Sequence, residues 1–169
     1  MVQLYILRHG EAGKRAPAAG GDTKRALTVA GEEEVREIAK ALSALGLELD
    51  FMASSPLERA RQTAQIVAKA LKVKKGSLEE WSELKPEGRR ADLYKRLAQF
   101  KPETSVMVVG HEPYLSTVVG ELVFGSPEGG RIILKKAGLA KVAVTSFQPK
   151  VKGELRWLLA PKHMKRMAR

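Results

Sequence analysis

The chain has 169 residues and 44% hydrophobic content, which is enough for one domain with a single buried core spanning residues 1–169. It carries 30 Lys and Arg against 19 Asp and Glu, a formal charge of +11 that favours anionic partners. It has no cysteine, which excludes disulfides, thiolate catalysis and cysteine-ligated metals.

Three further features narrow the class of protein. No run approaches the ~18 apolar residues of a membrane span, and the N-terminus enters a strand directly, so we expect a cytoplasmic protein with no membrane contact. Aromatic residues make up only 5%, which disfavours base stacking and hence nucleic acid as a partner. The histidines stand far apart at 9, 111 and 163, so neither a metal nor another cofactor is expected.

The first half of the chain alternates strands with helices. An apolar strand, Leu4–Leu7, leads directly into Arg8, His9 and Gly10, and a period-free loop follows over 11–24. Thr28 is the expected N-cap of a helix that ends at Gly46. A short buried strand over 49–55 then precedes a helix that opens at Pro56 and runs to about Leu71.

The second half repeats this alternation and ends in two strands. The remaining predicted elements are a weak strand at 77–81, a helix at 90–100, a strand at 105–109, a helix at 113–123, a loop at 125–130 and strands at 139–147 and 154–160. The last two form an antiparallel hairpin, and the basic tail over 162–169 is expected to fray, with His163 facing solvent. This order predicts a three-layer α/β/α sandwich with a mostly parallel sheet and an antiparallel edge.

Reactive side chains follow the strands of this predicted sheet. Arg8 and His9 come directly after the first strand, Arg59 lies near the start of a later helix, and His111 follows another strand. Open α/β sheets bind ligands at the carboxyl ends of their strands, where these groups meet. Two guanidinium groups bind the oxygens of a phosphoryl group, and a neutral imidazole can attack its phosphorus. Each residue alone also suits an ordinary structural role, but the ordered set predicts a phosphate site.

Three motifs resemble those of a known family. Arg8-His9-Gly10, the segment Ser54–Ala64 with its Arg-Ala-x-x-Thr-Ala core, and Gly110-His111 are similar to the motifs of the histidine phosphatase, or phosphoglycerate mutase-like, superfamily. The resemblance implies the phosphoglycerate mutase-like fold. It also implies that His9 accepts the phosphate, that Arg8 and Arg59 hold it, and that His111 completes the pocket.

Within this superfamily the chain resembles the SixA-type phosphohistidine phosphatases. Its length, Arg-His-Gly-Glu-Ala and the segment Asp22–Gly31 support this likeness, although Ala26 stands where those proteins have proline. Arg25 and Gly10 are then candidate substrate-binding residues, while Arg25 suits a plain surface position equally well. Ala12 and Lys14 differ from the Ser or Thr and the Asn that are typical of mutases.

A proton donor is the least defined part of the predicted site. Glu80 and Glu83, near Trp81, are the candidate carboxylic acids. A leaving imidazole, whose conjugate acid has a pKa of about 6.5, needs far less protonation than an alkoxide. A site without a defined acid therefore suits a phosphohistidine substrate.

Three functions agree with the sequence. The first is a metal-independent phosphatase for phosphohistidine in a signalling phosphotransfer protein. The second is a small-molecule phosphatase for a sugar or nucleotide phosphate. The third is a non-catalytic module that binds phosphate or nucleic acid and loses affinity steeply with salt. The glycine-rich stretch 125–130 lacks the Lys-Ser/Thr of a nucleotide P-loop.

Overall fold

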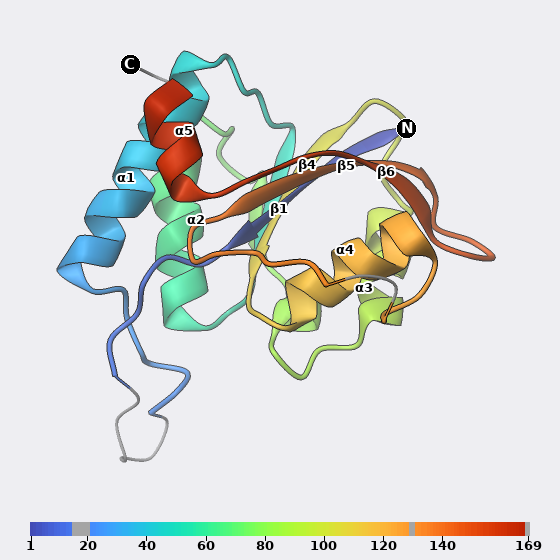
Figure 1. Ribbon diagram of the computed structural model, residues 1–169, viewed down its shortest axis with the longest axis horizontal. Coiled ribbons are helices and arrows are strands. Elements are labelled where there is room, and N and C mark those ends of the chain that lie inside the picture. The colour runs from blue at the N-terminus through green and yellow to red at the C-terminus, as the bar shows by residue number, and fades with distance from the viewer. Residues whose placement is uncertain (15–20, 129–130, 168–169) are drawn as a thin grey trace.

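A mixed six-stranded sheet runs through the computed structural model, which describes residues 1–14, 21–128 and 131–167 (Figure 1). The strands lie in the order β3-β2-β4-β1-β5-β6. Their bounds are β1 (Val2–Arg8), β2 (Phe51–Ser54), β3 (Leu78–Glu80), β4 (Ser105–Gly110), β5 (Leu139–Ser146) and β6 (Lys152–Leu159). Strands β1 to β4 are parallel, whereas β5 pairs antiparallel with β1 and with β6. The predicted antiparallel edge is thereby confirmed.

Helices cover both faces of the sheet. They are α1 (Val29–Ala44), α2 (Glu58–Ala70) and α5 (Pro161–Met167) on one face, and α3 (Arg90–Leu97) and α4 (Tyr114–Phe124) on the other, with a 3-10 turn, η1 (Ser82–Leu84), before α3 (Figure 1). In β1, Leu4 and Ile6 pack with α3 and α4, while Tyr5 and Leu7 pack with α1 and α2. Because both faces are buried, the strand reads as a continuous apolar run. The predicted three-layer α/β/α architecture is correct.

The predicted ends of α1 are also confirmed. The Thr28 hydroxyl accepts a hydrogen bond from the Gly31 N–H at 2.9 Å, which caps the helix. After the helix Gly46 adopts a left-handed φ of 72°, which glycine reaches without steric cost. Two other helices begin slightly later than expected, at Glu58 and Tyr114, because the prolines before them lie in the preceding turns.

The prediction that the C-terminal tail frays was wrong. Residues 161–167 form α5, Met164 is fully buried against the α1 face of the sheet, and the Lys165 ammonium lies 3.3 Å from carboxylate oxygens of both Glu34 and Glu37. The tail therefore has an apolar anchor and two ion pairs on a helix that precedes it by more than 100 residues. His163 is exposed as predicted, and residues 168–169 lie outside the described part of the chain.

Gly31 marks the closest approach between α1 and the segment that follows β1. A Cβ at Gly31 would lie 2.2 Å from the Glu11 carbonyl oxygen, a backbone atom with little room to move. We expect Gly31→Ala to destabilise the fold, because overpacking costs about 1–3 kcal/mol and a helical alanine recovers about 1 kcal/mol. The thermal unfolding midpoint should fall by several degrees. The control, Gly13→Ala, adds a Cβ whose nearest neighbour is 3.9 Å away and should leave the midpoint unchanged.

Candidate active site

Three strand ends meet at one point of the sheet. His9 follows β1, His111 follows β4, and Ser55 follows β2. Backbone hydrogen bonds continue the pairing past the strands, from His9 N–H to the Gly110 carbonyl at 3.1 Å and from Ser55 N–H to the Val109 carbonyl at 2.9 Å. As a result the two imidazole rings lie 5.1 Å apart, centroid to centroid, although 102 positions separate them in the sequence.

The orientation of the His9 ring is set by its own backbone. Its Nδ1 lies 2.7 Å from the Gly10 carbonyl oxygen, which can only accept a hydrogen bond. Nδ1 therefore carries the proton, and the neutral ring has its lone pair on Nε2. The Arg59 Nε donates to that Nε2 at 3.3 Å. The reactive nitrogen of His9 thus faces a guanidinium group.

Gly10 and Thr63 hold this arrangement together. The Gly10 N–H donates to the Thr63 hydroxyl at 3.1 Å, and that hydroxyl donates to the Arg59 carbonyl at 2.7 Å. A Cβ at Gly10 would lie 2.6 Å from a methyl carbon of Val35. The structure therefore gives Gly10 a positioning role toward His9; its predicted contact with substrate remains a prediction.

His111 is hydrogen-bonded through one ring nitrogen only. Its Nε2 lies 2.8 Å from the Ser55 hydroxyl, which accepts a hydrogen bond from the Leu57 N–H at 3.3 Å and so has its proton available for the ring. That arrangement leaves the proton of the neutral ring on Nδ1, which is buried and has no partner among the described residues. A buried N–H donor of this kind is suited to an anion.

Three arginines surround the two histidines. The nearly buried Arg59 donates to the Asp22 carbonyl at 2.8 Å and to its carboxylate at 3.3 Å, and Arg25 lies 3.3 Å from the other oxygen of the same carboxylate. The Arg8 Nη1 donates to the Leu134 carbonyl at 3.0 Å, and its buried Nε has no partner within the described ranges. Arg25, for which two placements were open, therefore lies beside Arg59 and is not an isolated surface residue.

Burial and positive charge keep both histidines neutral. Burial lowers the pKa of His9 to about 4; the Gly10 carbonyl opposes this shift, whereas the charges of Arg59, Arg8 and Arg25 add to it. Burial likewise lowers the pKa of His111 to about 3, with His9 and Arg59 as the next causes. At neutral pH the site therefore combines cationic guanidinium groups with a neutral imidazole that keeps its lone pair.

The two candidate proton donors are engaged elsewhere. The Glu80 carboxylate lies 3.6 Å from Arg61, and the Glu83 carboxylate lies 3.2 Å from Arg96. Neither residue has a hydrogen bond with His9 or His111 among those of the described residues.

Sequence reasoning assigned no role to Asp22, Ser55 or Thr63. The sequence could have indicated Thr63, because it follows Arg59 by four positions and so lies on the same face of the helix. A signal existed for Ser55 as well, because it follows a buried strand directly, as His9 does. Asp22 lies in a loop without periodicity, and only the structure shows that its carboxylate joins two arginines.

The family model of the histidine phosphatase superfamily (branch 1) matches residues 4–91, the part of the chain that carries His9 and Arg59. The chain therefore belongs to the histidine phosphatase superfamily. Membership assigns it phosphatase activity on a phosphorylated substrate.

Relatives span nearly the whole chain. Phosphohistidine phosphatase SixA of Escherichia coli (strain K12) is 30% identical over 166 residues, which is 97% of this chain and 97% of that protein. An uncharacterised protein of Picosynechococcus sp. is 34% identical over 165 residues, 95% of this chain and 98% of that protein. The solved structure of the protein histidine phosphatase SixA complexed with tungstate has a TM-score of 0.81 at 30% identity, and the match covers 96% of this chain and 99% of that one.

None of the helices within 1–14, 21–128 and 131–167 is both long enough and apolar enough to cross a membrane. Over the same ranges, no group of three or more His, Cys, Asp or Glu side chains is placed to hold a metal ion.

Proposed function

We propose that this protein hydrolyses phosphohistidine in a signalling phosphotransfer protein, with His9 as the nucleophile and no metal in the mechanism. The observation that carries this proposal is the His9 ring itself. Its Nδ1 proton is held by the Gly10 carbonyl, and its Nε2 lone pair faces the Arg59 guanidinium. A phosphoryl group bound by that guanidinium would lie next to the nitrogen that attacks it.

The reaction takes place in two steps. His9 Nε2 attacks phosphorus, and the bond from phosphorus to the substrate's imidazole nitrogen breaks. The substrate histidine, protonated on its other ring nitrogen, leaves with the bonding electron pair as neutral imidazole. Water then attacks the phosphorus of phospho-His9, which releases inorganic phosphate and returns His9 to its neutral form. Arg8, Arg59 and the Nδ1–H of His111 stabilise the negative oxygens in both transition states.

The carboxylates near the site support a phosphohistidine substrate over an alkyl phosphate. An alkoxide must be protonated as it leaves, whereas imidazole leaves as a base whose conjugate acid has a pKa of about 6.5. Glu80 and Glu83 are both paired with arginines, and neither has a hydrogen bond with His9 or His111 among the described residues. The likeness to SixA relatives over nearly the full chain supports the same substrate class.

The experiment that tests this function compares two donors. We expect kcat/KM for free phosphohistidine to exceed that for phosphoserine by about 10²-fold or more. The reason is that the alkoxide of phosphoserine needs a proton donor as it leaves, whereas the imidazole of phosphohistidine does not need one from the protein. Rapid quenching in alkali should also trap acid-labile phosphate on the protein. Equal rate constants on the two donors would support a small-molecule phosphomonoesterase, and hydrolysis of neither donor would support a non-catalytic binding module.

The pH profile provides a second test. Protonated imidazole has no free lone pair, so activity should decline as the pH falls through the pKa of His9, which is about 4. We expect the acid limb of kcat/KM for free phosphohistidine near pH 4, after subtraction of spontaneous hydrolysis. An acid limb near pH 6.5, the value of an unperturbed histidine, would contradict a buried, arginine-flanked nucleophile.

A further inference from the structure

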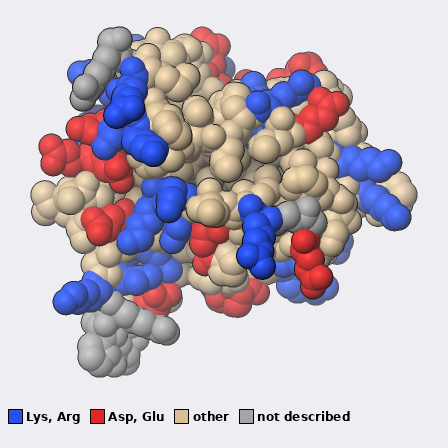
Figure 2. Space-filling model, viewed as in Figure 1, with Lys and Arg blue, Asp and Glu red and all other residues tan. Residues whose placement is uncertain are grey.

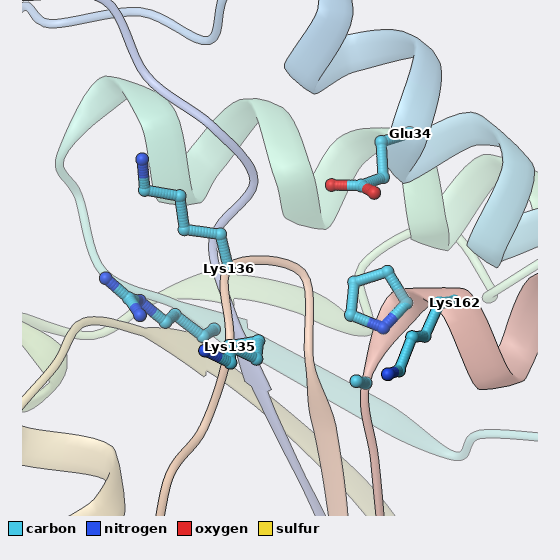
Figure 3. A pocket seen from close by; sticks show the side chains of 7 residues that line it. Glu34, Lys135, Lys136 and Lys162 are labelled. Atoms are coloured by element: carbon cyan, nitrogen blue, oxygen red, sulfur yellow. The ribbon is translucent and has the colours of Figure 1, made fainter.

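A second basic site lies beside the histidines, in a pocket of about 500 Å³ that we call the Lys135 pocket. Its lining comprises Arg8, Glu34, Lys135, Lys136, Ala160, Pro161 and Lys162. Figure 3 shows Lys135 and Lys136 on the chain that leads into β5, Lys162 at the start of α5, and Glu34 reaching in from α1. The mechanism proposed above uses only Arg8 of this set.

The turn that carries the two lysines is bonded to the catalytic segment. Ala137 N–H donates to the His9 carbonyl at 3.1 Å, Arg8 N–H donates to the Gly138 carbonyl at 3.1 Å, and the Arg8 guanidinium donates to the Leu134 carbonyl at 3.0 Å. These three hydrogen bonds, one just before the two lysines and two just after them, fix the base of the turn against Arg8 and His9. The lysines themselves remain exposed.

The charge in this pocket is unbalanced. Four cationic side chains line it against one carboxylate, Glu34, and that carboxylate lies 3.3 Å from Lys165 of α5. No carboxylate lies within 4.0 Å of the ammonium groups of Lys135, Lys136 or Lys162 in the described part of the chain. Figure 2 shows Lys and Arg side chains over the chain that leads into β5 and beside α5. The pocket thus attracts negative charge that the protein does not supply.

The side chains of the Lys135 pocket suit a protein surface as ligand better than a single small anion. Lysines are mobile point charges, whereas a site for a single small anion is usually built from rigid guanidinium forks and backbone N–H groups. On the same loop, Ile133 is 69% exposed, an apolar contact that a small anion does not use. The pocket also has more volume than one phosphate group fills.

We propose that the Lys135 pocket binds carboxylate side chains that flank the phosphohistidine on the surface of the phosphorylated partner protein. This inference rests on the proposed function, since it assigns that partner an acidic face next to its phosphorylated histidine. Arg8 lies at the border of both sites, so the phosphoryl group and the acidic flank bind side by side. The cations of the pocket then raise the encounter rate and orient the phosphohistidine toward His9.

The test uses two synthetic peptides that carry the same central phosphohistidine, flanked by glutamates in one and by glutamines in the other. We expect the protein to hydrolyse the Glu-flanked peptide with a kcat/KM about 10-fold higher, and this ratio should shrink with added salt. Lys135→Glu/Lys136→Glu should bring the ratio to about 1 or below. Lys135→Gln/Lys136→Gln, which only removes charge, should give an intermediate ratio.

The chain contains a matched control for this pair. Lys74 and Lys75 are also adjacent and exposed, but they precede β3 and so lie at the opposite end of the parallel strands. Lys74→Glu/Lys75→Glu should keep the ratio of the unaltered protein. A ratio near 1 in the unaltered protein, or a ratio that the Lys135/Lys136 variants do not change, would overturn the inference. Failure to hydrolyse free phosphohistidine would instead refute the proposed function.

Discussion

Replacement of His9 by alanine is expected to reduce kcat for phosphohistidine by at least about 10³-fold and to abolish the acid-labile phosphoenzyme. The physical reason is that the lone pair on His9 Nε2 is the electron pair that attacks the substrate's phosphorus in the first step of the proposed mechanism. The arginines would still bind phosphate in this variant. We therefore expect inorganic phosphate to remain a competitive ligand while turnover is lost, which a binding measurement beside the kinetic one would show.

His163→Ala is the matched control, because it removes an imidazole that is exposed on α5 and is not among the residues that line the Lys135 pocket. It should leave both kcat and phosphoenzyme formation unchanged. Since His9 is buried, the thermal unfolding midpoint of each variant must be compared with that of the unaltered protein. Turnover by a folded His9→Ala variant at near the normal rate would exclude His9 as the nucleophile.

Replacement of Arg59 by glutamine is expected to lower kcat/KM by about 10²- to 10³-fold, the usual effect of removing one donor that stabilises a transition-state oxyanion. Arg59 is only 3% exposed, so its charge acts with little screening by water. It donates to His9 Nε2 and to Asp22, so it also helps to position the nucleophile. Most of the loss should occur in kcat if the transition state gains more from this charge than the bound substrate does.

Arg61→Gln tests whether the effect is specific to that side of α2. Arg61 lies two positions further along the same helix, is 41% exposed, and pairs with Glu58 and Glu80. Because these exposed ion pairs contribute little and do not involve the histidines, kcat/KM should change by less than about 2-fold. A similar loss in both variants would mean that the general positive field, and not the placement of Arg59, accounts for phosphate recognition.

The layered architecture and the main site residues were predictable from the sequence because both depend on local patterns. Leu4–Leu7 and 105–109 are apolar runs that end in Arg8, His9 and Gly110-His111, and a strand buried on both faces requires such a run. Since parallel strands end at the same edge of a sheet, the histidines at those ends had to approach one another. The cap at Thr28 and the stop at Gly46 are similarly local.

The tertiary structure decided what depends on distant partners. The sequence of the tail is short and basic and predicts a mobile segment. In the structure, however, Met164 is buried against the sheet and Lys165 pairs with two carboxylates of α1. The carboxylate of Asp22 joins Arg25 to Arg59, and the turn at Lys135 is bonded to Arg8 and His9; neither relation has a sequence period. A residue's own neighbours determine its backbone preference, whereas its ionic and hydrogen-bond partners are set by which loops the sheet order brings together.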